Sequence, residues 1–145
     1  AYEKKHADPK RPIRWAACWA HARRYFENAT CGDEELRLRV LRCMRKLFRM
    51  EKIAWKKNAE VRLRIRRERE MPVVEEIFAR LKQELFEGRL LPRSKMGKAI
   101  AYMLSRKENF TLYLADPNIR MENNTAERGL RKVVIGRKNW MFVGS

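Results

Sequence analysis

The sequence predicts a mainly α-helical fold with a small β contribution. Apolar residues recur at helical spacing in several stretches between residues 19 and 134. Only two short runs, Ile13–Trp19 and Trp140–Val143, are rich in the aromatic and β-branched residues that favour strands. Residues that begin or end helices separate the periodic stretches and indicate where each helix lies.

The first 30 residues are expected to form loop, strand and helix in that order. Residues 1–12 are polar and contain two prolines, so we expect mostly loop there. The strand Ile13–Trp19 then leads into a helix through Glu27, in which Trp19, Ala22 and Phe26 lie on one face.

Residues 31–90 are expected to be helical and very basic. Asp33 can cap the first helix, and Asn58 can cap a second after a break near residues 55–57. Pro72 fits the first turn of a further helix, which Gly88 would end. The apolar stripes of the first and last of these helices are Leu36, Val40, Met44, Leu47 and Phe48, and then Val74, Ile77, Phe78, Leu81 and Leu85.

Residues 91–145 are expected to contain two helical stretches and a final strand. Ser94 can cap a helix whose apolar stripe is followed by more apolar residues up to a turn at Asp116–Pro117. Asn124 can cap another helix, which Gly136 would stop. The apolar positions of these two helices are Met96, Ala99, Ile100, Met103 and Leu104, and then Ala126, Leu130, Val133 and Val134.

Glu127 has two interpretations, one that follows from spacing alone and one that comes with the resemblance described below. It falls at the third position of the helix that Asn124 would cap, where a carboxylate can hydrogen-bond the cap amide. From spacing alone it is therefore a capping carboxylate, paired with Arg131 one turn on.

The charge of the chain is strongly unbalanced. Its 145 residues contain 35 Lys and Arg against 18 Asp and Glu, a formal net charge of +17. An excess this large indicates a polyanionic partner, with nucleic acid as the first candidate. Between Arg37 and Arg69 there are fourteen Lys or Arg and three Glu, which favours a surface that contacts the DNA backbone. The alternative is a helical hairpin whose basic side chains only keep it in solution.

No feature of the sequence indicates a membrane partner. There is no apolar run of the length of a membrane span and no signal-peptide pattern. A protein of the membrane surface would need a strongly amphipathic helix with an exposed aromatic face, and none is clear. The three cysteines are odd in number and widely spaced, which is typical of free thiols in a reducing compartment. We therefore expect a cytoplasmic protein associated with the nucleoid.

Three segments resemble the insertion-sequence-66-type transposases. They are Asn123-Asn-Thr-Ala-Glu-Arg128 with the following Gly136-Arg-Lys-Asn-Trp140 and Phe142-x-Gly-Ser145, then Cys18-Trp-Ala-His-Ala-Arg-Arg24, and Leu91-Pro-x-Ser-x-x-Gly-Lys-Ala-Ile100. This resemblance implies the C-terminal part of a ribonuclease-H-like core that carries a basic helical insertion. Residues 1–30 would be a core strand and helix, residues 31–90 the insertion, and residues 91–145 the C-terminal core helices and strand.

The resemblance also implies a reaction. Glu127 would be the third acid of an Asp-Asp-Glu set that binds Mg²⁺ or Mn²⁺ for cleavage and joining of DNA strands at transposon ends. Ala1-Tyr2 resembles the end of the family's Asp-Gly-Tyr-x-x-Tyr motif, so both Asp residues would precede Ala1 and the chain alone would be inactive. Glu122 stands where the family usually has Asp, which makes it a minor rival to Glu127.

The resemblance assigns further residues and partners. Double-stranded DNA would be the partner, and the complete transposase would be a homo-oligomer. His21, Asn123 and Asn124 would support the catalytic residue without binding the metal. Phosphate would be bound by Arg23, Arg24, Arg128, Arg131, Arg137 and Lys138.

Two alternatives stay open. Cys18 and His21 could be zinc ligands, but a zinc site needs about four ligands and no second pair is evident. The alternative function is a non-enzymatic, basic, helical nucleic-acid-binding protein.

Overall fold

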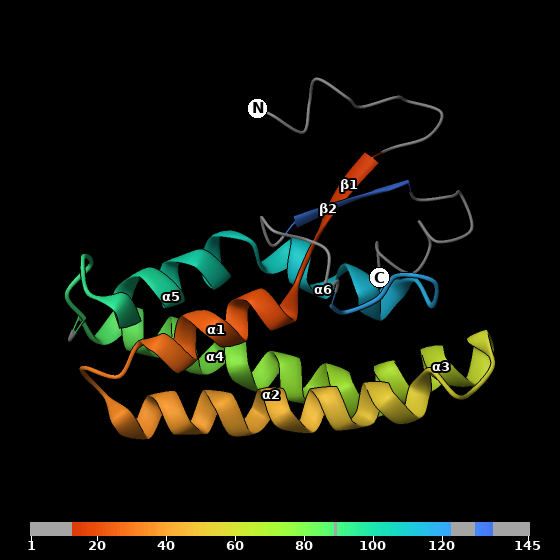
Figure 1. The fold of residues 1–145 in the computed structure, drawn as a ribbon, viewed down its shortest axis with the longest axis horizontal. Coiled ribbons are helices and arrows are strands. Elements are labelled where there is room, and N and C mark those ends of the chain that lie inside the picture. Colours follow the sequence, from red (N-terminus) through yellow and green to blue (C-terminus); the bar gives the residue numbers. More distant parts are fainter. Residues whose placement is uncertain (1–12, 89, 123–129, 135–145) are drawn as a thin grey trace.

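The computed structural model describes residues 13–88, 90–122 and 130–134, and this part is mainly helical, as predicted (Figure 1). Residues 1–12, 89, 123–129 and 135–145 lie outside the described part. The elements in chain order are β1 (Ile13–Ala17), α1 (Trp19–Asn28), α2 (Glu34–Ala54), α3 (Ala59–Ile65), the π-helical turn η2 (Arg66–Glu70), α4 (Met71–Glu87), α5 (Lys95–Ser105), α6 (Lys107–Ala115) and β2 (Leu130–Val134).

A long helical hairpin forms one side of the fold. Figure 1 shows α2 running one way and α3, η2 and α4 running back beside it, with α1 and α5 above them. Side-chain caps fix the ends of the helices at the predicted residues: Asp33 accepts from the Leu36 amide and Asn58 from the Val61 amide. Gly88 ends α4 in the left-handed conformation that favours glycine.

The return arm of the hairpin confirms the prediction for Pro72, which lies in the first turn of α4. The sequence did not predict that helical structure runs on from Ala59 to Glu87 without a break. The turn η2 ends two residues before the proline, and its bond from the Met71 amide to the Arg66 carbonyl spans five residues. Proline cannot donate to the carbonyl four residues back, and a π-helical turn is one way for a helix to continue past such a position.

The core lies between the hairpin and the helices above it. Trp19 is fully buried at its centre, with its indole N–H donating to the Phe110 carbonyl at 3.0 Å. Its ring meets those of Phe78 and Phe110 edge-on. The predicted stripe of α4 is wrong at Leu85, which is 59% exposed, because Glu84 points inward instead and pairs with Arg80 at 3.6 Å.

Two strands pair at the other side of the fold. β1 and β2 are antiparallel, with Ile13 opposite Val134 and Ala17 opposite Leu130. The predicted strand Ile13–Trp19 is confirmed for its first five residues, and Trp19 already begins α1. The predicted helix from Asn124 is wrong over residues 130–134, because their backbone pairs with β1 and tertiary pairing overrides a weak helical periodicity.

The finer architectural predictions are not decided by these elements. The described residues contain one two-stranded ladder, so a ribonuclease-H-like core stays a prediction, as does the division at residues 30 and 90. Over the same residues, no helix has both the length and the apolar character needed to cross a membrane.

Candidate functional site

Two connections bring Met121 and Leu130, which flank the segment 123–129 in the sequence, to the start of α1. On one side, the Met121 carbonyl accepts from the Trp19 amide at 3.0 Å. On the other, Leu130 lies opposite Ala17 in the strand ladder. Glu127 falls between these two connections in the sequence. Its own position lies outside the described residues, so the support of Glu127 by His21 stays a prediction.

Arg66 lies in a buried polar network between the hairpin and residues 113–119. Its Nε and Nη2 donate to the two carboxylate oxygens of Glu51 at 2.7 and 3.0 Å. Its other three N–H groups donate to the carbonyl oxygens of Tyr113, Asp116 and Ile119. All five donors of the guanidinium therefore have acceptors, which offsets the cost of burying its charge.

Glu70 completes this network. The Tyr113 hydroxyl donates to its Oε1 at 3.0 Å. Burial, a hydrogen bond to Glu51 and the charge of Glu51 together raise the pKa of Glu70 to about 9. Glu70 is therefore neutral at pH 7, and the ion pair of the network is that of Arg66 with Glu51.

Arg62, one helical turn before Arg66, holds the loop that follows α6. It donates to the carbonyl oxygens of Ala54 and Lys57, at the bend of the hairpin, and to that of Pro117 at 2.9 Å. Its guanidinium carbon lies 3.8 Å from the centre of the Trp55 ring, and that of Arg120 lies 4.0 Å from it. The hairpin thus fixes the loop that leads to residue 123.

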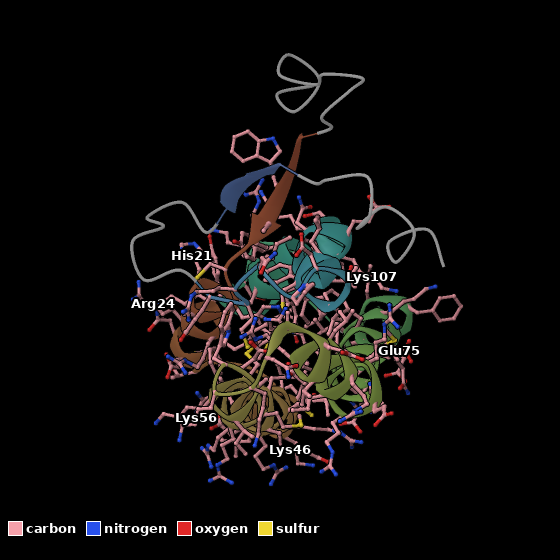
Figure 2. All side chains as sticks on the ribbon, turned by 90° about the vertical axis from the view of Figure 1, so that its right-hand side faces the viewer. His21, Arg24, Lys46, Lys56, Glu75 and Lys107 are labelled. Carbon is pink, nitrogen blue, oxygen red and sulfur yellow. The ribbon has the colours of Figure 1, made fainter. Side chains whose placement is uncertain are left out.

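These two arginines correct the interpretation of the basic run. Arg62 and Arg66 are buried structural residues and cannot contact a partner, and Arg37 is paired with Glu34 at 2.6 Å. Exposed cations nevertheless cover the hairpin, and Figure 2 shows Lys46 and Lys56 projecting from it. The exposed basic residues of the run are Arg39, Arg42, Arg45, Lys46, Arg49, Lys52, Lys56, Lys57, Arg64, Arg67 and Arg69.

A groove of about 700 Å³ lies between α1, α2 and residues 120–122. Its cationic side chains are Arg23, Arg45, Arg49, Lys52 and Arg120. Its carboxylates are Glu27, Glu51 and Glu122, but Glu51 is already paired with Arg66. The balance of charge in this groove, which we call the α1–α2 groove, is therefore positive and suits an anion.

A second pocket, of about 330 Å³, lies between α1 and α5. His21 and Arg24 line this pocket, whereas Arg23 lines the α1–α2 groove with its guanidinium 4.5 Å from the Phe48 ring. The structure therefore brings His21 and Arg24 together, as Figure 2 shows, and separates them from Arg23. Burial lowers the pKa of His21, and the charges of Arg24 and Arg106 lower it further.

The described residues hold no metal centre of their own. No group of three or more His, Cys, Asp or Glu side chains within them could hold an ion. Cys18 is buried, and Glu122 is half-buried at the α1–α2 groove. A centre of three such ligands would therefore need at least one residue from outside the described part.

The remaining predicted site residues cannot be placed. Arg131 lies opposite Ala16 in β2, but its side chain is not described. The others fall outside the described residues: Asn123, Asn124, Glu127, Arg128, Arg137 and Lys138.

The sequence contains a signal for the buried network. Arg62, Arg66 and Glu70 follow one another at intervals of four, and the same interval leads to Val74 in the apolar stripe of α4. Charged residues that continue an apolar stripe at helical spacing are candidates for burial with partners.

The fold and its grooves define a basic, mainly helical protein with surfaces that suit an anion. A family model described as "Transposase IS66 family" matches residues 1–145, and the chain belongs to this family. The resemblance inferred from the three sequence segments is thereby confirmed.

Relatives occur in Sinorhizobium fredii (strain NBRC 101917 / NGR234). The chain is 37% identical to its uncharacterized protein y4hP, over 92% of this chain and 26% of that protein. It is 34% identical to uncharacterized protein y4qI, over 92% of this chain and 24% of that protein. The chain therefore spans about a quarter of the length of these relatives. No solved structure matches it.

Proposed function

We propose that this chain is the C-terminal part of the catalytic region of a bacterial DNA transposase. It binds duplex DNA through the phosphate backbone and contributes Glu127 to metal-dependent phosphoryl transfer at transposon ends. The observation that carries this proposal is the family match over residues 1–145. The two Asp residues of the catalytic set would precede Ala1.

The exposed cations of the hairpin support backbone binding. They project from α2, α3 and η2, and a phosphate contact needs only a positive charge that is free to reach it. The salt bridges inside this run, Arg37 with Glu34 and Arg66 with Glu51, leave most of the exposed charge for a partner.

The α1–α2 groove supports a position for DNA beside the catalytic segment. Arg23 and Arg49 offer phosphate ligands there, and the guanidinium fork suits a phosphate better than an ammonium does. Met121 and Glu122 form one wall of the same groove and directly precede the segment that contains Glu127. A phosphate in the groove would lie near the point where that segment begins.

The family's divalent ions, Mg²⁺ or Mn²⁺, would stabilise the attacking and leaving oxygens of the phosphodiester. Glu127 would hold them together with the two preceding Asp residues. Arg128, Arg131, Arg137 and Lys138, together with Arg24, would bind further phosphates. His21, Asn123 and Asn124 would keep Glu127 in position.

Strand joining by a longer chain that includes the preceding residues tests this proposal. Glu127→Gln should abolish joining and leave DNA binding intact, because Gln keeps the size of the side chain but cannot supply a negative charge to the metal. Glu122→Gln is the matched control and should leave joining largely intact. Joining at near wild-type rate by Glu127→Gln would instead favour the capping role, whereas absence of joining by the unsubstituted longer chain would favour a non-enzymatic DNA-binding protein.

A further inference from the structure

The pocket between α1 and α5 has a chemistry distinct from that of the α1–α2 groove. Its volume is about 330 Å³, near the lower end of the range for small-ligand sites. Its lining residues are His21, Arg24, Tyr25, Asn28, Lys95 and Lys98. We call it the α1–α5 pocket.

The charge of the α1–α5 pocket is purely positive. Arg24, Lys95 and Lys98 line it, and none of its lining residues is a carboxylate. The α1–α2 groove, in contrast, includes three glutamates. Three cations around so small a space suit a single anionic group such as a phosphate.

An ordered aromatic ring lies beside these cations. Tyr25 is 37% exposed, and its ring centre lies 4.7 Å from that of Tyr102 at an interplanar angle of 33°. His21 packs edge-on against Tyr25 at 5.3 Å, and Arg106 covers the Tyr102 ring at 4.4 Å. The buried Tyr102 and the half-buried His21 therefore hold Tyr25 in place while part of its surface faces the pocket.

A phosphate site, an exposed ring and an amide together match the parts of a nucleotide. The cations would take the phosphate, Tyr25 would stack on the base, and the Asn28 amide could hydrogen-bond the base edge. Inside a duplex, the faces of the bases are covered by their neighbours in the stack. Tyr25 could therefore stack only on a base that has left the duplex.

We propose that the α1–α5 pocket binds one unpaired nucleotide of the DNA substrate, an inference that rests on the proposed function. The pocket would thus recognise a frayed or single-stranded end beside a duplex whose backbone lies on the basic surface. The predicted contribution of Arg24 to DNA binding then belongs to this pocket and to a single-stranded nucleotide.

Binding of two matched DNAs to the 145-residue chain tests this proposal. One is a blunt duplex and the other is the same duplex with a short single-stranded extension, each followed by fluorescence anisotropy at one salt concentration. The extended DNA should bind about five- to tenfold more tightly, within the range measured for stacking of one base on an aromatic side chain. Tyr25→Leu should remove this preference and leave affinity for the blunt duplex unchanged.

Two further variants separate stacking from folding. Tyr25→Phe keeps the ring and should keep the preference for the extended DNA. Lys98→Gln changes an exposed residue and should weaken binding of the extended DNA more than that of the blunt duplex. Equal binding of the two DNAs by the unmodified chain, or an unchanged preference in Tyr25→Leu, would overturn the pocket assignment alone. Absence of binding to both DNAs would overturn the proposed function as well.

Discussion

Arg66 and Glu51, which lie 15 residues apart in sequence, form a buried ion pair with two hydrogen bonds. This pair joins the two arms of the hairpin. The same guanidinium donates to three carbonyl oxygens between Tyr113 and Ile119. One buried side chain therefore connects the basic hairpin to the loop that leads to the family's C-terminal signature. The same side chain therefore holds together both arms of the hairpin and residues 113–119.

Replacement of Arg66 should be strongly destabilising. Arg66→Leu leaves the Glu51 carboxylate buried without its partner and three carbonyl oxygens without their donor. Loss of one partner of a buried pair costs about 3–5 kcal/mol. Chemical denaturation should show a loss of this size, whereas Arg69→Leu, at an exposed position of the same turn, should change stability by less than about 0.5 kcal/mol. Equal losses in the two variants would contradict the role assigned to Arg66.

Glu70 should make stability fall as pH rises. Its pKa is about 9 in the folded chain against an ordinary value of 4.5, so between these values the folded state keeps a proton that the unfolded state has released. The free energy of unfolding should therefore decrease with pH in this window, by up to about 1.4 kcal/mol per pH unit from this group. Glu70→Gln carries no titrating proton and should show a flatter profile.

Denaturation at a series of pH values checks this expectation. Glu68→Gln, at an exposed position in the same turn, is the control and should keep the wild-type profile. Parallel profiles for the wild type and Glu70→Gln would show that Glu70 ionises normally.

Gly97 should not tolerate alanine, although it lies inside a helix. A Cβ there would collide with the Leu91 carbonyl oxygen and come within 3.1 Å of that of Pro92. Gly→Ala inside a helix normally stabilises by about 0.5–1 kcal/mol, whereas forced overlap in a packed site costs about 1–3 kcal/mol. Thermal unfolding of Gly97→Ala should therefore give a lower Tm, and a higher Tm would show that the loop can move away.

Local signals made much of the helical fold predictable. Asp33, Asn58 and Ser94 each accept a hydrogen bond from the backbone amide three residues later, as expected of a helix cap. Such caps depend on a few neighbouring residues, so a sequence pattern is enough to find them.

Errors arose where distant residues decide the structure. Leu130–Val134 pairs with a strand more than 100 residues earlier, and no local pattern contains that partner. The burial of Arg66 likewise depends on Glu51 and on the loop after α6. For the site, the resemblance predicts roles for His21, Arg23 and Arg24, but it could not show that Arg23 lines the α1–α2 groove and Arg24 the α1–α5 pocket.

Duplex binding through phosphates is tested most directly by the salt dependence of affinity, measured by anisotropy for the wild-type chain, Arg49→Gln and Lys82→Gln. Both variants remove one exposed positive charge, but only Arg49 lines the α1–α2 groove. Each phosphate contact contributes about −0.9 to the slope of log affinity against log salt concentration. The wild type should show a steep negative slope, Arg49→Gln a slope shallower by about 1, and Lys82→Gln the wild-type slope. Equal wild-type affinity at low and high salt would contradict DNA-backbone binding by this chain.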